Sequence, residues 1–361
     1  MRIIQLVSSL GIGGAEKFVV DLSIAQSKLG HKIIVVVLDN AEDVGKDPIY
    51  ASNLEKKLSD NNIKVVYMGH KARRNPIKIY FKLKSLITEF KPEVVHSHLI
   101  WWSIFVSCIN KDFVHLFTQH TNIITRKKIH IFFLKHFIDK YVTICDEAFD
   151  DALNLFSTKK VCKIVNGVVT GEFTYKNREN DNVLNLVTIS RLTEYKNHHI
   201  IIDVVNDIKS YYPNNKFRLN IIGDGPLFNK LIAKVTELKL TEHVIFHGSK
   251  SNINEILLNN DLYLLPSKKE GFSIALIEAL ASGIRIIASN VGGNSEILNN
   301  GKLGVLISPN DINGLHEALV NCLINKTSCN SKSDVVSKME ELSIETCASN
   351  HLKEYNRLLI V

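Results

Sequence analysis

The chain has 361 residues, of which 45% are hydrophobic and 22% are charged. This composition excludes collagen-like, low-complexity and intrinsically disordered proteins, and the length predicts two domains rather than one. The longest apolar run, near residues 100–109, is far shorter than the ~20 residues that span a bilayer. The first nine residues predict a strand rather than a signal peptide, because no small-residue cleavage site follows them.

The cysteines are scattered and form no C-x-x-C motif, so neither a disulfide framework nor a zinc site is expected. They indicate buried or inert thiols in a reducing compartment, and we expect a cytoplasmic protein. The six are Cys108, Cys145, Cys162, Cys322, Cys329 and Cys347.

The formal net charge is +7, and residues 1–170 carry all of the excess. Two segments concentrate it, residues 71–84 and 126–141, in which Lys, Arg and His are interleaved with Ile, Phe and Leu. Such segments are typical of an anionic membrane surface, at about 1 kcal/mol per basic residue near the lipid. The alternative is two amphipathic helices with solvated basic faces and their Phe and Ile turned inward. Nucleic acid is not an expected partner, because no nucleic-acid-binding motif is present.

Short β-branched segments alternate with amphipathic helical segments along the whole chain, which is typical of parallel sheets with helices on both faces. Two such series predict an α/β protein with two Rossmann-like domains, divided within residues 166–182 into domains 1–168 and 169–342. Residues 343–359 predict a terminal helix. Strands are predicted at residues 3–7, 33–38, 64–67, 94–96, 115–118, 141–144, 163–165, 185–189, 218–222, 244–247, 262–265, 284–288 and 304–307.

A glycine loop, Gly11 to Gly14, follows the first predicted strand and opens a helix. Together with Asp39 after the second strand it resembles a dinucleotide fingerprint, but Glu16 replaces the third glycine, so the match is weak. Backbone N–H groups at a helix start favour a phosphate or a sugar hydroxyl near Gly13 and Gly14. The alternative is a tight turn without a ligand.

Two basic residues, Arg191 and Lys196, flank the loop after the first strand of the second half. A guanidinium forks onto phosphate oxygens and an ammonium neutralises a second charge, so the pair suits a diphosphate. Surface basic residues on a loop are the alternative.

The most specific signal is a pair of carboxylates, Glu270 and Glu278, in residues 270–283. Ser273 is a good N-cap residue, and the helix that follows is apolar on almost every face, so it is buried. Glu278 on such a helix needs hydrogen-bond donors, which the vicinal diol of a ribose supplies. The alternative is a core helix whose acid pairs with a neighbouring base.

These motifs resemble the retaining glycosyltransferases of family 4, of the bacterial surface-polysaccharide type. Glu270 and Glu278 match the E-x7-E motif of that family, and Arg191 and Lys196 match its R-x4-K clamp. Further matches, in the expected order, are Gly13-Gly14-Ala15-Glu16, Thr118-Gln119-His120, Asn166-Gly167-Val168, Gly223-Asp224-Gly225-Pro226, Phe246-His247-Gly248, Pro266-Ser267 and Val291-Gly292-Gly293.

The resemblance implies a GT-B fold, in which two Rossmann-like domains face each other across a cleft. The domain at residues 1–168 would bind the acceptor, with residues 343–361 packing on it, and the domain at residues 169–342 would bind the nucleotide sugar. No cofactor and no metal ion are implied, because the nucleotide sugar is a substrate and GT-B enzymes resemble metal-independent catalysts.

The resemblance also implies residue roles. Arg191 and Lys196 would hold the diphosphate, Glu278 the ribose, and Glu270 the hydroxyls of the donor sugar. His120 would lie near that sugar, although a packed, hydrogen-bonded histidine is the alternative. Backbone and base contacts would come from Gly271, Phe272, Ser273, Gly223, His247 and Gly248, and Gly13 and Gly14 would close on the diphosphate or the acceptor.

Two further histidines, His96 and His98, follow a strand and could shape the acceptor side, with Trp101 and Trp102 stacking on sugar, touching a membrane or packing in the core. A metal site made by His96, His98 and His120 is not expected.

The expected reaction is the transfer of a hexosyl or N-acetylhexosaminyl unit from a nucleoside-diphosphate sugar, with UDP favoured, to a hydroxyl of a lipid-linked glycan. Retention by same-face attack is favoured over a covalent intermediate on Glu270. The acceptor would be a glycan or polyprenyl-diphosphate-linked glycan at the inner membrane face, in lipopolysaccharide or capsule synthesis. The alternatives are a GT-B sugar-nucleotide epimerase, an NAD-dependent oxidoreductase, and a sugar-binding module without turnover.

Overall fold

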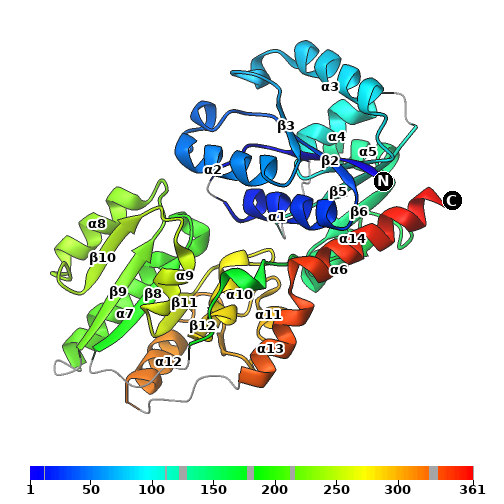
Figure 1. Cartoon of the computed structure of the whole chain (residues 1–361). Helices are drawn as coiled ribbons and strands as arrows, with labels where there is room; N and C mark the ends of the chain where they lie inside the picture. Colours follow the sequence, from blue (N-terminus) through cyan, green and yellow to red (C-terminus); the bar gives the residue numbers. More distant parts are fainter. Residues whose placement is uncertain are drawn as a thin grey trace. The chain divides into compact units, whose positions relative to one another are not determined.

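The computed structural model describes residues 1–11, 13–109, 112–121, 128–176, 183–211, 216–324 and 332–360. The chain divides into two compact units (Figure 1). Unit 1 comprises Met1–Val168 with Leu342–Val361, and unit 2 comprises Val169–Glu341.

Unit 1 is built on a seven-stranded parallel sheet in the order β3-β2-β1-β4-β5-β6-β7. Its central strands are rich in Ile and Val and are buried on both faces, as parallel strands covered by helices must be. The strands are β1 (Arg2–Val7), β2 (Lys32–Val37), β3 (Lys64–Tyr67), β4 (Val94–Ser97), β5 (Val114–Thr118), β6 (Lys140–Thr143) and β7 (Val161–Lys163).

Helices cover both faces of this sheet. One face carries α1 (Gly14–Lys28), α2 (Pro48–Ser59) and α14 (Ile344–Leu359), and the other carries α3 (Pro76–Phe90), α4 (Ile100–Ser107) and α5 (Lys128–Phe137) (Figure 1). Helix α6 (Asp146–Leu153) follows β6. Short 3₁₀ turns lie at Glu42–Val44 and Ala72–Arg74.

The last helix belongs to unit 1 although it is the end of the chain. The N–H of Val168 donates to the carbonyl of Leu342 at 3.0 Å, and the N–H of Ile344 donates back to Val168 at 2.8 Å. Helix α14 packs on α1, and Lys140 of β6 pairs with Glu354 at 2.9 Å. Gly167 permits this close approach, because a Cβ there would lie 2.4 Å from the carbonyl oxygen of Ser343.

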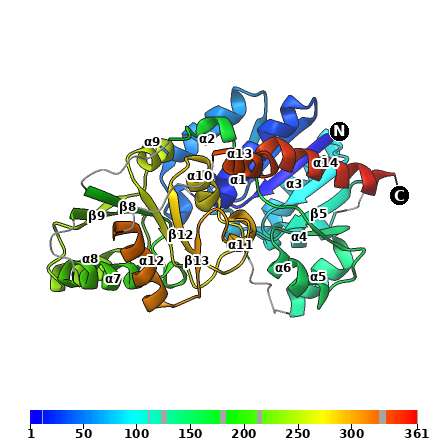
Figure 2. The ribbon, with the colours of Figure 1, turned by 90° about the horizontal axis from the view of Figure 1, so that it is seen from below.

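Unit 2 contains a six-stranded parallel sheet in the order β10-β9-β8-β11-β12-β13. Helices α7, α8 and α12 lie on one face, and α9 and α10 lie on the other (Figure 2). The strands are β8 (Val183–Ile189), β9 (Lys216–Ile222), β10 (Val244–Gly248), β11 (Leu262–Leu265), β12 (Arg285–Ser289) and β13 (Val305–Ile307). The helices are α7 (His198–Tyr211), α8 (Phe228–Glu237), α9 (Ile253–Leu258), α10 (Ile274–Ala281), α11 (Asn294–Ile297), α12 (Ile312–Ile324) and α13 (Lys332–Glu341).

Within the described residues, each predicted strand is present and the terminal helix is confirmed. The strand predicted at residues 163–165 was placed too late: β7 is Val161–Lys163, because Val161 pairs with Tyr141 at the start of β6. After β7 only the N–H of Ile164 still donates to Thr143, so the β-branched residues Ile164 and Val165 lie beyond the strand.

The segments of the chain that the structure describes include no helix long and apolar enough to cross a membrane. The described cysteines are all free thiols, and Cys108 is exposed rather than buried, whereas Cys329 lies outside the described residues.

Candidate active site

The carboxyl ends of three neighbouring strands meet in unit 2. The N–H of Ser190 after β8 donates to Ile222 of β9 at 3.0 Å, and the N–H of Gly223 donates to Gly248 of β10 at 2.8 Å. Gly223 has φ +133°, and a Cβ there would lie 2.0 Å from the carbonyl oxygen of Ser190. The backbone thereby brings Gly223, Gly248 and the exposed Arg191 to one edge of the sheet.

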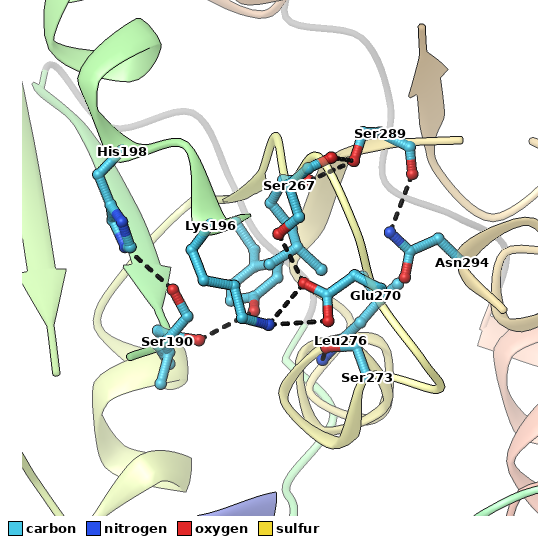
Figure 3. Close-up of polar contacts among 12 residues, drawn as sticks. Ser190, Lys196, His198, Ser267, Glu270, Ser273, Leu276, Ser289 and Asn294 are labelled. Atoms are coloured by element: carbon cyan, nitrogen blue, oxygen red, sulfur yellow. Dashed lines mark hydrogen bonds and ion pairs between the residues drawn. The ribbon is translucent and has the colours of Figure 1, made fainter. Parts of the chain in front are cut away.

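Glu270 is the most tightly held carboxylate at this edge. The ammonium Nζ of Lys196 lies 2.6 Å from Oε1 and 2.7 Å from Oε2 of Glu270. The Ser267 hydroxyl also donates to Oε1 at 2.5 Å (Figure 3). Glu270 is only 7% exposed. Both of its oxygens are therefore engaged, and its charge is matched by Lys196.

A second set of hydrogen bonds fixes the loop that carries Glu270. The Ser289 hydroxyl donates to the carbonyl of Ser267 at 2.5 Å, and the Asn294 amide donates to the carbonyl of Ser289 at 2.9 Å (Figure 3). Gly292 has φ +55°, and a Cβ there would lie 2.3 Å from the carbonyl oxygen of Glu270. The position of Glu270 is thus set by groups on β12 and on the turn after it.

Helix α10 starts directly after this loop. Ser273 caps it by accepting the N–H of Leu276 at 3.4 Å, as its sequence predicted. Glu278 lies on α10 and is 4% exposed, among neighbours that are also buried. Burial raises the pKa of Tyr263 in β11 well above 10, and the charges of Glu270 and Glu278 add to the effect. Tyr263 therefore lies near both carboxylates.

The two predicted basic residues behave differently. Lys196 ends a short 3₁₀ turn, Glu194–Lys196, and its ammonium is committed to Glu270. The side chain of Arg191 is exposed and has no carboxylate partner among the described residues. An ammonium has three N–H donors, so Lys196 keeps one after its two bonds to Glu270.

His247, predicted to line a base, is exposed at the end of β10. Its Nε2 lies 2.8 Å from Oδ1 of Asn220, and burial followed by the charge of Lys250 lowers its pKa. It lines a pocket of about 360 Å³ whose walls include Arg218, Lys250 and several asparagines. No single segment of the sequence marks this pocket, because its residues come from four separate elements.

In unit 1 the glycine loop is covered by side chains. Glu16 lies over Gly13, where a Cβ would be 2.3 Å from its Oε2, and Glu16 pairs with Lys46. The Arg73 guanidinium donates to both carboxylate oxygens of Asp39, at 3.0 Å to Oδ1 and at 2.9 and 2.7 Å to Oδ2. The carboxylate that would bind a ribose in a dinucleotide site is therefore already paired with an arginine. This pairing argues against an NAD-dependent oxidoreductase.

His120 follows β5 and belongs to a group of packed histidines in unit 1. Its Nε2 lies 2.9 Å from Nδ1 of His98, and the two rings stack. Burial, followed by the nearby His351, lowers the pKa of His120 to about 3, so its ring is neutral at physiological pH. Its Nδ1 atom is buried and has no hydrogen-bond partner in the described part of the chain.

The two tryptophans after β4 have different environments. Trp102 is fully buried and donates to the carbonyl of Val7 at 2.9 Å, whereas Trp101 is 48% exposed. No group of three or more His, Cys, Asp or Glu side chains in the described segments is arranged to hold a metal ion.

Two family profiles match almost the whole chain. Residues 12–172 match the profile described as "Glycosyltransferase Family 4", and residues 171–337 match "Glycosyl transferases group 1". In the solved structure of HepE from Anabaena in complex with UDP and glucose, the same fold occurs with a TM-score of 0.82 over 99% of this chain and all of the other, at 17% identity. The fold is therefore GT-B, the fold of glycosyltransferases. The chain belongs to the family 4 glycosyltransferases.

Curated relatives match over shorter segments. The N-acetyl-alpha-D-glucosaminyl L-malate synthase of Bacillus anthracis is 33% identical over 138 residues, which are 38% of this chain and 35% of that protein. The UDP-Gal:alpha-D-GlcNAc-diphosphoundecaprenol alpha-1,3-galactosyltransferase of Escherichia coli is 38% identical over 101 residues, 28% of this chain and 26% of its own. The matched segments thus span about a third or less of these relatives.

The structure thus brings most of the expected donor residues to one edge of unit 2, and it places His120, Gly13 and Gly14 in unit 1. Sequence reasoning missed Ser289, Asn294 and His198. His198 Nε2 lies 2.9 Å from the Ser190 hydroxyl, and burial lowers its pKa to about 4.

Proposed function

We propose that the protein transfers a hexosyl or N-acetylhexosaminyl group from a UDP-sugar to a hydroxyl of a lipid-linked glycan, with retention of configuration. The observation that carries the proposal is the Glu270–Lys196 pair beside Arg191 at the strand ends of unit 2. The family and the fold, shared with a protein solved with UDP and glucose, support the same donor class.

The donor binds through charges and backbone groups of unit 2. Arg191 has no internal carboxylate partner in the described residues, so its guanidinium is available to the diphosphate, and Lys196 offers its third N–H to the same group. Glu278 accepts the ribose hydroxyls. The backbone N–H groups at Gly271–Ser273, before α10, add partial positive charge toward sugar and phosphate oxygens.

Catalysis consists of breaking the bond between the anomeric carbon and the phosphate oxygen. Negative charge develops on the leaving diphosphate, and preorganised donors there stabilise the transition state. Arg191, Lys196 and the start of α10 supply the positive charge that stabilises the leaving diphosphate. We therefore propose that the reaction requires no metal ion and no cofactor.

Same-face attack is the retaining route that the geometry supports best. Both oxygens of Glu270 are bound by Lys196, and one also by Ser267, which makes the carboxylate a poor nucleophile. The acceptor oxygen then bonds to the anomeric carbon on the face that the leaving group departs from, and its proton passes to a leaving phosphate oxygen. Mass-spectrometric detection of a sugar ester on Glu270 would contradict this route.

The acceptor side rests on the surface of unit 1. The neighbouring helices α3, α4 and α5 expose large apolar side chains beside basic ones, which suits an anionic lipid surface. The apolar residues, which are 48–69% exposed, are Ile77, Phe81, Trp101, Ile129 and Phe132. The exposed basic residues are Lys78, Lys82, Lys84, Lys128 and Lys135. We call these ten side chains the basic-apolar surface.

For the two basic segments, residues 71–84 and 126–141, the alternative was that Phe and Ile turn inward. That alternative is wrong for part of the described residues. Helix α3 buries Ile79, Leu83, Leu86 and Ile87 but exposes Phe81, and α5 buries Leu134 but exposes Phe132. A membrane at this surface would bring a lipid-linked acceptor close to unit 1. The name of the Escherichia coli relative contains such an acceptor, a diphosphoundecaprenol.

The donor proposal is tested by ligand-induced thermal stabilisation with UDP, GDP, ADP and NADH, in the wild type and in Glu278→Ala. A ligand at 100 times its Kd stabilises the fold by about 2.7 kcal/mol. Stabilisation by UDP that is lost in Glu278→Ala supports the proposal and justifies a screen of UDP-sugars with and without glycan acceptors. Stabilisation by NADH alone would overturn it, and conversion of a donor without an acceptor would favour an epimerase.

A further inference from the structure

A chain of hydrogen-bonded side chains runs from His120 to helix α14 inside unit 1. His120 Nε2 lies 2.9 Å from His98 Nδ1, and His98 Nε2 lies 2.8 Å from Gln5 Oε1. Gln5 Nε2 then donates to Gln26 Oε1 at 2.9 Å, and Gln26 Nε2 donates to the Tyr355 hydroxyl at 3.4 Å. The chain therefore joins β1, β4, β5, α1 and the last helix of the protein.

The chain continues beyond Tyr355 to a fully buried histidine. The Tyr355 oxygen lies 2.7 Å from Nδ1 of His96, and Nε2 of His96 lies 2.7 Å from Oγ1 of Thr118. Burial lowers the pKa of His96 and His98 well below 6.5, and neighbouring histidines lower them further. These rings are therefore neutral, and each has one N–H donor and one lone-pair acceptor.

The direction of every link follows from the orientation of the two glutamine amides, as assigned in the structure. Gln5 Oε1 accepts only, so Nε2 of His98 carries the proton. Nδ1 of His98 is then a bare acceptor, so Nε2 of His120 must carry a proton and donate to it. Nδ1 of His120 is left with a bare lone pair, and it is a buried atom that has no hydrogen-bond partner among the described residues.

The far end agrees with this direction. Because Gln26 donates to the Tyr355 oxygen, the Tyr355 hydroxyl hydrogen is free to bond to Nδ1 of His96. His96 then donates from Nε2 to Thr118. Every link thus has one donor and one acceptor, and no two donors or two acceptors face each other.

We propose that His98 is a positioning residue that holds His120 in its Nε2–H tautomer, so that Nδ1 of His120 accepts a hydrogen bond from a hydroxyl of the bound sugar substrate. The identity of that ligand rests on the proposed glycosyltransferase function, whereas the tautomer is a property of the free protein. A bare lone pair selects a hydroxyl hydrogen and repels phosphate and carbonyl oxygens, so the tautomer decides which substrate group His120 recognises. With the opposite tautomer, His120 would present an N–H and the preference would be reversed.

The tautomer can be measured directly in the full chain labelled with ¹⁵N-histidine. Two-bond ¹H–¹⁵N correlation spectra distinguish a protonated ring nitrogen from a bare one, and His120→Gln assigns the signals. We expect a protonated Nε2 and a bare Nδ1 for His120 at neutral pH without ligand. A protonated Nδ1 would mean that the chain runs in the opposite direction and would overturn the proposal.

The role of His98 is tested by His98→Phe, which keeps an aromatic ring and removes both nitrogens. We expect the His120 signals to move to the average of two tautomers. Gln5→Leu, which removes the acceptor that orients His98, should have the same effect and serves if His98→Phe does not fold. An unchanged His120 tautomer in a folded variant of either kind would overturn the proposal.

A matched control is His351→Gln. His351 is buried and its ring centroid lies 5.3 Å from that of His96, but its Nδ1 bonds to the carbonyl of Cys347 in its own helix at 3.0 Å. His351 shares no hydrogen bond with the side chains that link His120 to Tyr355 and His96, so the His120 tautomer should be unchanged. A tautomer shift in this control equal to that in His98→Phe would show that general packing, not the chain, sets it.

Kinetics separate this proposal from the proposed function. In His98→Phe we expect kcat for sugar transfer to fall at least tenfold, with the Kd for UDP unchanged, because the UDP-binding groups lie in unit 2. A wild-type protein that has the expected tautomer but transfers no sugar would contradict the proposed function and leave the tautomer assignment intact. Loss of the tautomer with unchanged kcat would refute the role of His98 in recognition.

Discussion

The ammonium of Lys196 contacts both oxygens of Glu270, at 2.6 and 2.7 Å, in a site where the Glu270 side chain is only 6% exposed. The pair therefore has two functions that need not be lost together: it neutralises a buried carboxylate, and it holds that carboxylate and one spare N–H in place for a ligand.

Replacing the lysine should destabilise the free protein. Lys196→Met removes the positive charge and keeps the apolar stem, which leaves the buried Glu270 carboxylate with the Ser267 hydroxyl. Breaking a buried pair from one side costs about 3 kcal/mol, and this should appear in urea unfolding without any ligand. In the double variant Lys196→Met/Glu270→Gln, much of the loss should be recovered, because no charge is then stranded.

Lys230→Met is the matched control for this experiment. Lys230 pairs with Glu194 at 3.7 Å, but the two side chains are 77% and 60% exposed. An exposed pair contributes about 0–1 kcal/mol, so the control should be nearly neutral. Equal losses in the two lysine variants would contradict the view that the Glu270–Lys196 pair is a buried, site-forming contact.

Gly292 gives a backbone test of the same loop. Gly292→Ala places a Cβ 2.3 Å from the carbonyl oxygen of Glu270 in a residue with φ +55°. The loop must shift to relieve the clash, so we expect UDP to stabilise the variant less than the wild type. Gly301→Ala is the control, because φ there is +89° but no atom lies within 3.4 Å of the added Cβ. It should lose some stability through strain and keep its UDP response.

The backbone of this site was predictable in outline, but its polar support was not. The spacing of Glu270, Ser273 and Glu278 fixes a capped, buried helix within a single segment, so sequence alone places those three residues. Ser289 and Asn294 support the loop through one carbonyl each, and no pattern in their own segment marks them. Their role depends on the pairing of β11 with β12, which is a tertiary fact.

The histidines illustrate the same limit in unit 1. His98 and His120 follow β4 and β5, which are neighbours in the sheet, so their proximity could be inferred from two strand predictions. Tyr355 contacts His96 from the far end of the chain, and it does so because α14 packs on unit 1. A terminal amphipathic helix has an apolar face that any domain can bury. Its hydrophobic pattern therefore does not predict which of the two domains it packs on.

The buried histidines predict an acid-sensitive fold. Burial lowers the pKa of His120 to about 3 and of His351 to about 4 from an ordinary 6.5. The unfolded chain therefore binds more protons than the folded one below pH 6.5, and stability is lost as pH falls from 6.5 toward 4. A histidine with a pKa of about 4 in the folded state contributes on the order of 3 kcal/mol to this loss.

This loss is measured by urea unfolding between pH 7.5 and 5, above the range in which ordinary carboxylates titrate. His351→Gln removes one such group, so the slope of the unfolding free energy against pH near pH 5.5 should fall by about 1 kcal/mol per pH unit. The control is His316→Gln on α12, where the histidine is only half-buried, and it should change the slope much less. A stability that rises on acidification would mean that these rings are charged in the folded protein.

Membrane attachment is tested by reversing charges on the basic-apolar surface. Lys82→Glu/Lys84→Glu/Lys128→Glu changes the net charge by six on helices α3 and α5; Lys127, a further basic residue of this segment, lies outside the described residues. At about 1 kcal/mol per basic residue near an anionic lipid, we expect co-sedimentation with phosphatidylglycerol vesicles to fall by two orders of magnitude or more, while UDP still stabilises the protein.

The control triple variant, Lys28→Glu/Lys56→Glu/Lys353→Glu, makes the same change in net charge on α1, α2 and α14, which cover the opposite face of the sheet. If the basic-apolar surface docks on lipid, this control keeps most of its vesicle binding, because its lysines face away from the bilayer. Equal losses in the two variants would mean that net charge alone drives binding. Phe81→Ser/Phe132→Ser then separates the apolar contribution, which should persist at high salt, since salt screens charges but does not weaken apolar insertion.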